Sequence, residues 1–480
     1  MPLTIPKKPC LFTIFGASGD LAKNMIFPSL YQLAKAKGLP KECWFIGYAR
    51  STMTRDEFHA MVRKGVEEHT EGVDQKVLKE MLSRTWYFSG QYNDKKDFEA
   101  YQEFIKKTTK KKGIAHIAYF SVPPNVYEDI VRNLAETRLS SGDDIRLVME
   151  KPFGESTKTA ERLYHFVSRY FTSDQFYLLD HYLGKPAVRS ILQLRQANRI
   201  LSHMMRGSEV ANIQITACEK NGVEERAGYF DQTGITKDMI QSHLLQILAL
   251  VTMSIPVRKN PENLQREKYS ILSALECPCD TKNLVIGQYK SYKRQDKKSS
   301  SGGPIYRAET FTALRLMLDR EEWFRVPIYI RTGKKLHKKH TYVVIELKKY
   351  PFQSKKEEPN RVILELQPEQ KIHITLLNKH EGSDKYQQIT TSDSIACDIE
   401  GGCLPEHATL LREIMMGEKL HFLSFPEIIA SWRLVDEVHH IIQHEKIIMH
   451  TYPDGSPGPK EQHVLPEQDG FSWYDLPLEK

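Results

Sequence analysis

The sequence is poor in cysteine and has no internal repeat and no apolar run long enough to cross a membrane. Its seven cysteines are odd in number and scattered over 480 residues, which argues against a secreted disulfide scaffold and favours a reducing compartment. Cys277 and Cys279 are close together but lack a matching second pair, so we expect no metal site. The longest apolar stretch, residues 244–257, is interrupted by Gln246 and is shorter than the roughly 20 residues of a bilayer-spanning helix. We therefore expect a cytoplasmic chain with no membrane partner.

The net charge is only mildly positive. A balance of +7 provides a weak field that attracts phosphorylated ligands, but it is too diffuse to identify a partner. The basic run of residues 106–112 fits a nucleic-acid-binding module or, equally well, a solvated helix end. Neither a known binding motif nor an aromatic-basic stripe accompanies the run, so we expect no nucleic-acid partner.

The length of the chain favours two domains. A single core rarely serves 480 residues, and 40% hydrophobic with 27% charged residues is ordinary for a globular protein. Up to residue 185 short β-branched or aromatic runs alternate with helical patterns, which predicts a doubly wound, Rossmann-type α/β domain. We expect its strands at residues 11–15, 44–48, 86–89, 116–122, 145–150 and 176–179. The helices between them are expected at residues 21–37, 55–69, 98–111, 126–138 and 160–170.

After residue 185 the pattern changes. A long helical stretch covers residues 237–253, and strand-like runs at residues 213–217, 308–319 and 362–366 predict a mainly antiparallel sheet. Residues 293–304 are typical of an exposed loop, and residues 452–465 of a tail rich in proline and glycine. We therefore expect a nucleotide-binding domain over residues 1–185 and a larger α+β domain over residues 186–480.

A glycine turn follows the first strand and opens the first helix. Glycines permit a tight turn and a close approach of the pyrophosphate to backbone amides, and the helix N-terminus adds a favourable dipole. The Gly-x-x-Gly-x-x-Ala spacing is weak as a bare pattern, and a purely structural turn is the alternative. The residues expected to contact a nucleotide here are Gly16, Ala17, Ser18, Gly19, Asp20 and Leu21.

Arg50 ends the second strand, where an acidic residue would bind the ribose hydroxyls of NAD. A fixed cation with several donors suits a ribose phosphate instead, so the sequence favours NADP over NAD. A solvated surface arginine is the alternative interpretation.

Three further segments fall where this fold places its ligand site. They are Glu-Lys-Pro-Phe-Gly at residues 150–154, Asp-His-Tyr-Leu-Gly-Lys at residues 180–185 and Asp-Met-Ile-Gln-Ser-His-Leu-Leu at residues 238–245. The last two are polar-rich strings with no evident packing purpose. Together with the glycine turn, the segments resemble the glucose-6-phosphate dehydrogenases, from about residue 9 to about residue 450.

The resemblance implies an NADP-dependent oxidoreductase. The expected reaction oxidises the anomeric carbon of glucose 6-phosphate to 6-phosphogluconolactone, the first step of the oxidative pentose phosphate pathway. The family is usually homodimeric, and the sequence does not separate a dimer from a tetramer.

By resemblance, the catalytic base is His243 and Asp180 orients it. The chemistry requires a group that accepts a proton near neutrality while the carbon loses hydride, and histidine with a reference pKa of about 6.5 suits this. The alternative for His243 is a hydrogen-bonded histidine on an apolar helix. Asp238 lies five residues before His243, so on an α-helix the two do not share a face, and Asp180 is the better orienting partner.

The resemblance also assigns the substrate ligands. The phosphate would be held by His181, Tyr182 and Lys185, and the sugar hydroxyls by carboxylates at Glu219 and Asp238. Taken alone, Tyr182 and Lys185 are equally well explained as a packing residue and a surface lysine. The remaining expected ligands are Lys151, which bridges sugar and cofactor, and Lys334 and Lys339, of which Lys339 also fits a solvated basic loop.

Some family members bind a second, structural NADP through basic residues of the second domain. The matching positions here are Glu365 and Thr375, one acidic and one neutral. We therefore expect no second nucleotide.

Two related alternatives remain open. A glucose-fructose oxidoreductase type of enzyme also has a Glu-Lys-Pro segment, but the string at residues 180–185 argues against it. A catalytically inactive relative is disfavoured by the presence of Lys151, Asp180 and His243.

Overall fold

The computed structural model describes most of the chain. The described residues are 5–6, 8–111, 113–137, 139, 144–223, 227–258, 260–276, 280–292, 308–354, 357–379, 386–395, 403–444 and 447–477. The expected loop at residues 293–304 and the cysteines Cys277, Cys279 and Cys397 lie outside these ranges. Cys10, Cys43 and Cys218 are free thiols, whereas Cys403 is disulfide-bonded.

The chain divides into two compact units. The first comprises residues 1–185 and 397–428, and the second comprises residues 186–396 and 429–480. The expected division placed every residue after 185 in the second domain. Residues 397–428 depart from it because α13 (Glu406–Met416) packs on α1 (Phe27–Lys35), α7 (His181–Gly184) and the first sheet.

The first unit is built on a parallel sheet of order β3-β2-β1-β4-β5-β6. This order confirms the expected Rossmann-type fold, in which the chain moves outward twice from the central strand β1. All six residues of β1 are buried, since helices cover both faces of such a sheet. The strands are β1 (Cys10–Phe15), β2 (Cys43–Ala49), β3 (Thr85–Ser89), β4 (Ala115–Phe120), β5 (Ile145–Glu150) and β6 (Phe176–Leu179).

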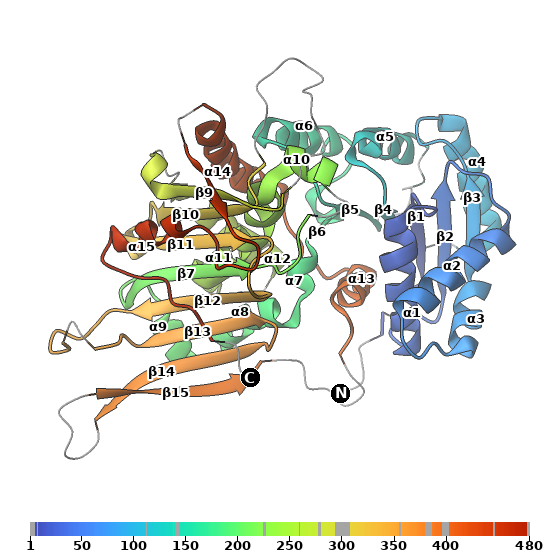
Figure 1. Cartoon of the computed structure of the whole chain (residues 1–480). Helices are drawn as coiled ribbons and strands as arrows, with labels where there is room; N and C mark the ends of the chain where they lie inside the picture. Colours follow the sequence, from blue (N-terminus) through green and yellow to red (C-terminus); the bar gives the residue numbers. More distant parts are fainter. Residues whose placement is uncertain are drawn as a thin grey trace. The chain divides into compact units, whose positions relative to one another are not determined.

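Two groups of helices cover this sheet. Helices α1, α2 and α3 pack together, and α4, α5 and α6 form a second packed series, as right-handed crossovers on opposite faces require. Figure 1 labels α1 to α4 beside the blue strands of the unit and α6 farther from them. Their bounds are α2 (Arg55–His69), α3 (Gln75–Ser83), α4 (Lys95–Thr109), α5 (Tyr127–Glu136) and α6 (Thr157–Val167).

The second unit is built on a larger mixed sheet of order β15-β14-β13-β12-β7-β11-β10-β9-β16, with β8 (Leu275–Glu276) paired to β10. Only the β7–β11 and β9–β16 pairs are parallel, so the sheet is mainly antiparallel as expected. Its strands are β7 (Val210–Cys218), β9 (Leu284–Tyr289), β10 (Phe311–Leu318), β11 (Ile328–Gly333), β12 (His340–Leu347), β13 (Arg361–Gln367), β14 (Lys371–Lys379), β15 (Tyr386–Ser394) and β16 (Met449–Tyr452).

Helices pack on one face of this sheet. On β10, Thr312 bonds Thr236 of the π-helix η5 (Thr236–Leu244), with 2.9 Å between the two hydroxyl oxygens. Helices α8 (Pro186–Ala197), α11 (Leu245–Thr252) and α12 (Pro261–Leu272) complete this layer, with α8 against β13 and α11 between α8 and α12.

The C-terminal segment packs on the opposite face. Because strand side chains alternate, Arg315 of β10 and its partner Tyr329 of β11 point away from η5, and both bond the carboxylate of Asp469. Arg331 points the same way and stacks 4.3 Å from the centre of the Trp473 ring. The tail therefore closes the second face of the sheet.

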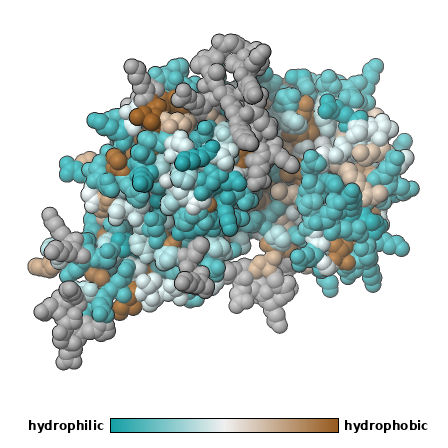
Figure 2. Space-filling model, in the orientation of Figure 1, coloured by the Kyte–Doolittle hydropathy of each residue, from teal (hydrophilic) through white to brown (hydrophobic). Residues whose placement is uncertain are grey.

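The face drawn in Figure 2 is mostly hydrophilic or of intermediate hydropathy, with small separate hydrophobic patches. Within the described ranges no helix combines the length and apolar character needed to span a membrane.

The turn after β1 has no room for a side chain at Gly16. Its φ is +83°, its N–H donates to the Tyr48 carbonyl at 2.8 Å, and an added Cβ would lie 2.1 Å from the Ser121 carbonyl oxygen. Gly113 has a similar φ of +72° but no atom within 4 Å of an added Cβ. A comparison of alanine substitutions at Gly16 and Gly113 therefore distinguishes the cost of backbone strain, which both share, from that of a steric clash, which only Gly16 has.

We predict that Gly16→Ala is much more destabilising than Gly113→Ala. Both variants carry the left-handed backbone cost, and only the first adds a clash of about 1–3 kcal/mol. In a thermal melt of the full chain, Gly16→Ala should melt roughly 2–12 °C below Gly113→Ala. Equal melting temperatures would show that the turn yields freely at Gly16.

Candidate active site

The glycine turn presents backbone amides at the start of a helix. Gly19 N–H donates to the Gly16 carbonyl at 3.0 Å, and the first helical segment is the π-helix η1 (Ala22–Ile26), which continues into α1. Asp20 and Gly19 are exposed, so this end of the turn is open to a ligand. A helix start after a tight turn suits a pyrophosphate.

Arg50 follows β2 and lies beside Tyr92, a residue that sequence reasoning missed. The guanidinium carbon is 5.7 Å from the centre of the Tyr92 ring, which makes a cation–π contact. Burial raises the pKa of Tyr92 and the Arg50 charge opposes this rise. The Ser51 hydroxyl donates to the Ser18 hydroxyl at 3.0 Å, so the glycine turn and the end of β2 are joined. The only hint of Tyr92 in the sequence is its place in the Gly-Gln-Tyr string after β3.

Two neighbouring strands deliver Lys151 and Asp180. In the sheet Glu150 of β5 pairs with Leu179 of β6, so the next residue of each strand emerges from the same edge. Asp180 is 1% exposed and caps α7, accepting from the Tyr182 N–H at 2.9 Å. The structure therefore fixes the Asp180 backbone and one carboxylate oxygen.

Helix α7 arranges the expected phosphate ligands. The His181 and Tyr182 rings meet edge to face with centres 5.2 Å apart, and the Lys185 ammonium lies 3.6 Å from the centre of the Tyr182 ring. Lys185 is only 8% exposed, whereas His181 is exposed. An ammonium over an aromatic face is held in place by a cation–π contact, and its donors suit a nearby anion.

In the second unit three expected site residues form one cluster. The Lys334 ammonium lies 2.5 Å from Glu219 Oε2 and 3.2 Å from Asp238 Oδ2. Burial by itself would lower the pKa of Lys334, but the two carboxylates outweigh it and raise the pKa. The cluster thus presents a fixed cation between two acceptors, which suits sugar hydroxyls.

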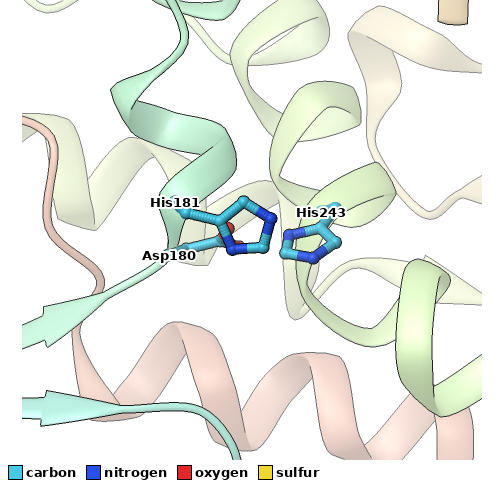
Figure 3. Close-up of side chains that lie close together, drawn as sticks. All are labelled: Asp180, His181 and His243. Carbon is cyan, nitrogen blue, oxygen red and sulfur yellow. The ribbon is translucent and has the colours of Figure 1, made fainter. Parts of the chain in front are cut away.

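Asp238 and His243 lie on the π-helix η5, which corrects the helical-wheel argument. A π-helix pairs residue i with residue i+5, so Asp238 and His243 come one turn apart instead of on different faces. His243 is 4% exposed. Figure 3 shows His243 on this helix and Asp180 and His181 where β6 gives way to α7.

The basic loop after β11 is heterogeneous. Tyr452, which is fully buried, donates its hydroxyl proton toward the Lys334 carbonyl at 2.8 Å, and Lys338 donates to the Leu476 carbonyl at 2.8 Å. Lys339 is exposed. The backbone of Lys334 is therefore fixed, while Lys339 has the environment of a solvated lysine.

Glu365 and Thr375 have partners of their own. The Glu365 carboxylate contacts His340 Nε2 at 2.9 Å and His373 Nε2 at 3.2 Å, and Thr375 Oγ1 accepts from the Arg361 N–H at 2.8 Å. Burial alone would raise the pKa of Glu365, but the two histidines outweigh it and lower the pKa. This part of the sheet holds a buried anion.

Two family models match the chain. "Glucose-6-phosphate dehydrogenase, NAD binding domain" matches residues 13–190, and "Glucose-6-phosphate dehydrogenase, C-terminal domain" matches residues 192–474. Together they cover both units.

Whole-chain comparisons agree. Glucose-6-phosphate 1-dehydrogenase 2 of Mus musculus is 31% identical over 96% of this chain and 92% of the relative. Glucose-6-phosphate 1-dehydrogenase 6, cytoplasmic, of Arabidopsis thaliana is 31% identical over 97% and 93%. A solved structure described as glucose-6-phosphate dehydrogenase in complex with its substrate glucose-6-phosphate matches with a TM-score of 0.86 and 27% identity, covering 98% of this chain and 100% of that chain. The chain belongs to the glucose-6-phosphate dehydrogenase family.

Proposed function

We propose that the chain oxidises glucose 6-phosphate at its anomeric carbon to 6-phosphogluconolactone, with NADP as the acceptor, in the first step of the oxidative pentose phosphate pathway. The observation that supports this best is the Lys334–Glu219–Asp238 cluster, one helical turn from His243 on segments that match the family throughout. Residues 1–185 bind the nucleotide and the substrate phosphate, and the second domain binds the sugar hydroxyls.

His243 is the general base and Asp180 orients it. The anomeric hydroxyl gives its proton to the imidazole while its carbon loses hydride, so a carbon–oxygen double bond forms. A bound nicotinamide nucleotide would supply the acceptor for that hydride. A carboxylate on the second ring nitrogen fixes the tautomer and stabilises the imidazolium.

The glycine turn and Arg50 hold the nucleotide. The turn from Gly16 to Leu21 binds the pyrophosphate at the helix start, and the Arg50 guanidinium binds the ribose phosphate of NADP. The stacked Tyr92 ring limits the positions open to Arg50. Lys151 contacts both nucleotide and sugar.

The remaining assigned residues bind the sugar phosphate. His181, Tyr182 and Lys185 supply donors and charge to the phosphate, and the 3.6 Å contact of Lys185 with Tyr182 supports a shared role. Glu219, Asp238 and Lys334 bond the sugar hydroxyls. Lys339 is a further substrate ligand in this proposal. Because its side chain is exposed, it can approach the phosphate of an entering substrate.

A second nucleotide site is not part of this proposal. The buried carboxylate of Glu365, with its two histidine partners, would repel a phosphate, and Thr375 offers no charge.

The chain forms a homodimer in the cytoplasm under this proposal. All nine residues of the edge strand β15 are exposed, and among them Tyr386 and Ile389 are 49% and 42% exposed. An uncovered edge with apolar side chains favours association. Light scattering should give twice the 55.6 kDa of the chain, or four times for a tetramer, and cell fractionation tests the location. A stable mass of 55.6 kDa would contradict the homodimer.

The function is tested by following absorbance of the reduced nucleotide with purified chain. Glucose 6-phosphate with NADP should react, free glucose should react far more slowly, and NAD should be the poorer acceptor. No reduction with either nucleotide would refute the proposed reaction, and equal rates with glucose and its phosphate would favour the oxidoreductase alternative.

We predict that Arg50→Ala weakens the binding of NADP far more than the binding of NAD. Loss of charge-assisted bonds to the ribose phosphate should raise the KM for NADP roughly 10- to 100-fold and leave the KM for NAD nearly unchanged. Arg162→Ala removes the same charge from an exposed position of α6 and serves as the control. An equal loss for both nucleotides would refute the specificity role of Arg50.

We predict that His243→Asn lowers kcat roughly 10²- to 10⁴-fold, the usual range for loss of a general base, with little change in substrate affinity. The control is His203→Asn, at an exposed position of α9 (Arg199–Met204). Near-normal turnover of a folded His243→Asn variant would remove His243 from the mechanism.

A further inference from the structure

A buried chain of polar groups ends at Glu150, the last residue of β5. The Tyr119 hydroxyl donates to the Glu150 carboxylate and also lies 3.1 Å from His407 Nε2. Tyr119 is fully buried and His407 is 7% exposed. His407 belongs to α13, so residues 288 apart in sequence meet at Tyr119.

In this series of hydrogen-bonded groups, the donor and the acceptor of each bond can be assigned. Burial first, and then the charge of His181, lowers the pKa of His407 to about 4, so His407 is neutral near pH 7. Burial and the Glu150 charge raise the pKa of Tyr119, so the phenol keeps its proton. The single Tyr119 proton points to Glu150, and the tyrosine oxygen must then accept from a His407 Nε2–H.

Glu150 is a neighbour of two residues of the proposed site, one along the chain and one across the sheet. Lys151 is the next residue, and Asp180 follows Leu179, the register partner of Glu150. Its backbone carbonyl accepts from the Tyr127 hydroxyl of α5 at 3.1 Å. Both the side chain and the backbone of Glu150 are therefore held by tyrosine hydroxyls.

The charges around the Glu150 carboxyl compete. Burial raises its pKa to about 7, with the Tyr119 hydrogen bond opposing, Asp180 adding to the rise and Lys151 opposing it. Among the described residues, the titratable groups that act on its charge are thus Tyr119, Asp180 and Lys151, while His407 bonds Tyr119 and Tyr127 bonds the Glu150 carbonyl. An ionised Glu150 attracts the Lys151 ammonium, and a neutral one does not.

We propose that Glu150 is a positioning residue for Lys151, held in place by Tyr119 and His407 and acting in its ionised form. The proposal rests on the proposed function, in which Lys151 contacts both sugar and nucleotide. A misplaced Lys151 weakens the binding of both and loosens their alignment for hydride transfer. In a purely structural role, the same groups would only tie α13 to the sheet.

We predict that Tyr119→Phe raises the KM for both glucose 6-phosphate and NADP by about tenfold, because Glu150 loses its donor and Lys151 its fixed neighbour. The matched control is Tyr101→Phe, which removes another fully buried tyrosine hydroxyl. That hydroxyl lies 2.7 Å from Thr13 Oγ1 and bonds Thr13 instead of Glu150. If the melting temperatures of the two variants fall equally and neither variant changes KM, the role of Tyr119 is structural and the proposal fails.

The charge of Glu150 is tested by Glu150→Gln, which keeps an acceptor for Tyr119 but cannot ionise. Activity of the wild type should fall as pH decreases through about 7, where Glu150 takes up a proton, and further as the histidine base becomes protonated. The acid limb of log kcat should therefore exceed a slope of one in the wild type and equal one in Glu150→Gln. Superimposable pH profiles would overturn the proposal.

Nucleotide binding separates this proposal from the proposed function. The Kd for NADP, measured by quenching of tryptophan fluorescence, requires no turnover. Tyr119→Phe should raise this Kd relative to Tyr101→Phe even if the wild type fails to oxidise glucose 6-phosphate. An unchanged Kd would be enough to refute the proposal that Tyr119 and Glu150 position Lys151, whatever the activity assay shows.

Discussion

The parallel alignment of the first sheet is the constraint on which the chemistry of the first unit depends. Parallel strands all end at one edge, so residues distant in sequence emerge side by side. Gly16 follows β1, Arg50 follows β2, Lys151 follows β5 and Asp180 follows β6. The register of β5 with β6 then brings Glu150 beside the residue that precedes Asp180. The sheet therefore selects which side chains share the edge, and the turns after the strands decide how they point.

Burial acts with opposite results on two charged groups of the proposed site. At Lys334 two carboxylates outweigh the cost of burial, which leaves a permanent cation whose position is fixed. At Glu150 burial dominates over one phenol and one lysine, which leaves a carboxyl that changes charge near neutrality. The number of opposite charges decides between these outcomes, two at Lys334 and one at Glu150, since each opposite charge offsets part of the desolvation. One unit thus holds a fixed charge and the other a titrating one.

Much of the fold follows from local pattern. The strands expected at residues 145–150 and 176–179 have those bounds, and the helix at residues 55–69 is also as expected, with a Thr54–Glu57 capping box at its start. Helix α3 was not expected, although Asp74 caps it, because its nine residues provide only a short apolar period. The polar strings at residues 180–185 and 238–245 were also identifiable, because no packing purpose is evident for them in the sequence.

The remainder depends on contacts that no local pattern encodes. The π-helix η5 has the same apolar spacing as an α-helix, so the five-residue step from Asp238 to His243 was assigned to the wrong geometry. The return of α13 to the first sheet, and with it the His407–Tyr119–Glu150 chain, is set by tertiary packing across hundreds of residues. Tyr92 was missed because a single aromatic residue after a strand is more often part of the core.

The central claim is that an imidazole oriented by a carboxylate removes the proton of the anomeric hydroxyl. The most direct measurement is a crystal structure of the full chain with glucose 6-phosphate and reduced NADP, a combination that cannot react. The account predicts one ring nitrogen of His243 within hydrogen-bond distance, about 2.6–3.2 Å, of the anomeric oxygen and the other on the Asp180 carboxylate. A His243 ring turned away from the sugar, or an Asp180 carboxylate bonded elsewhere in that complex, would contradict it.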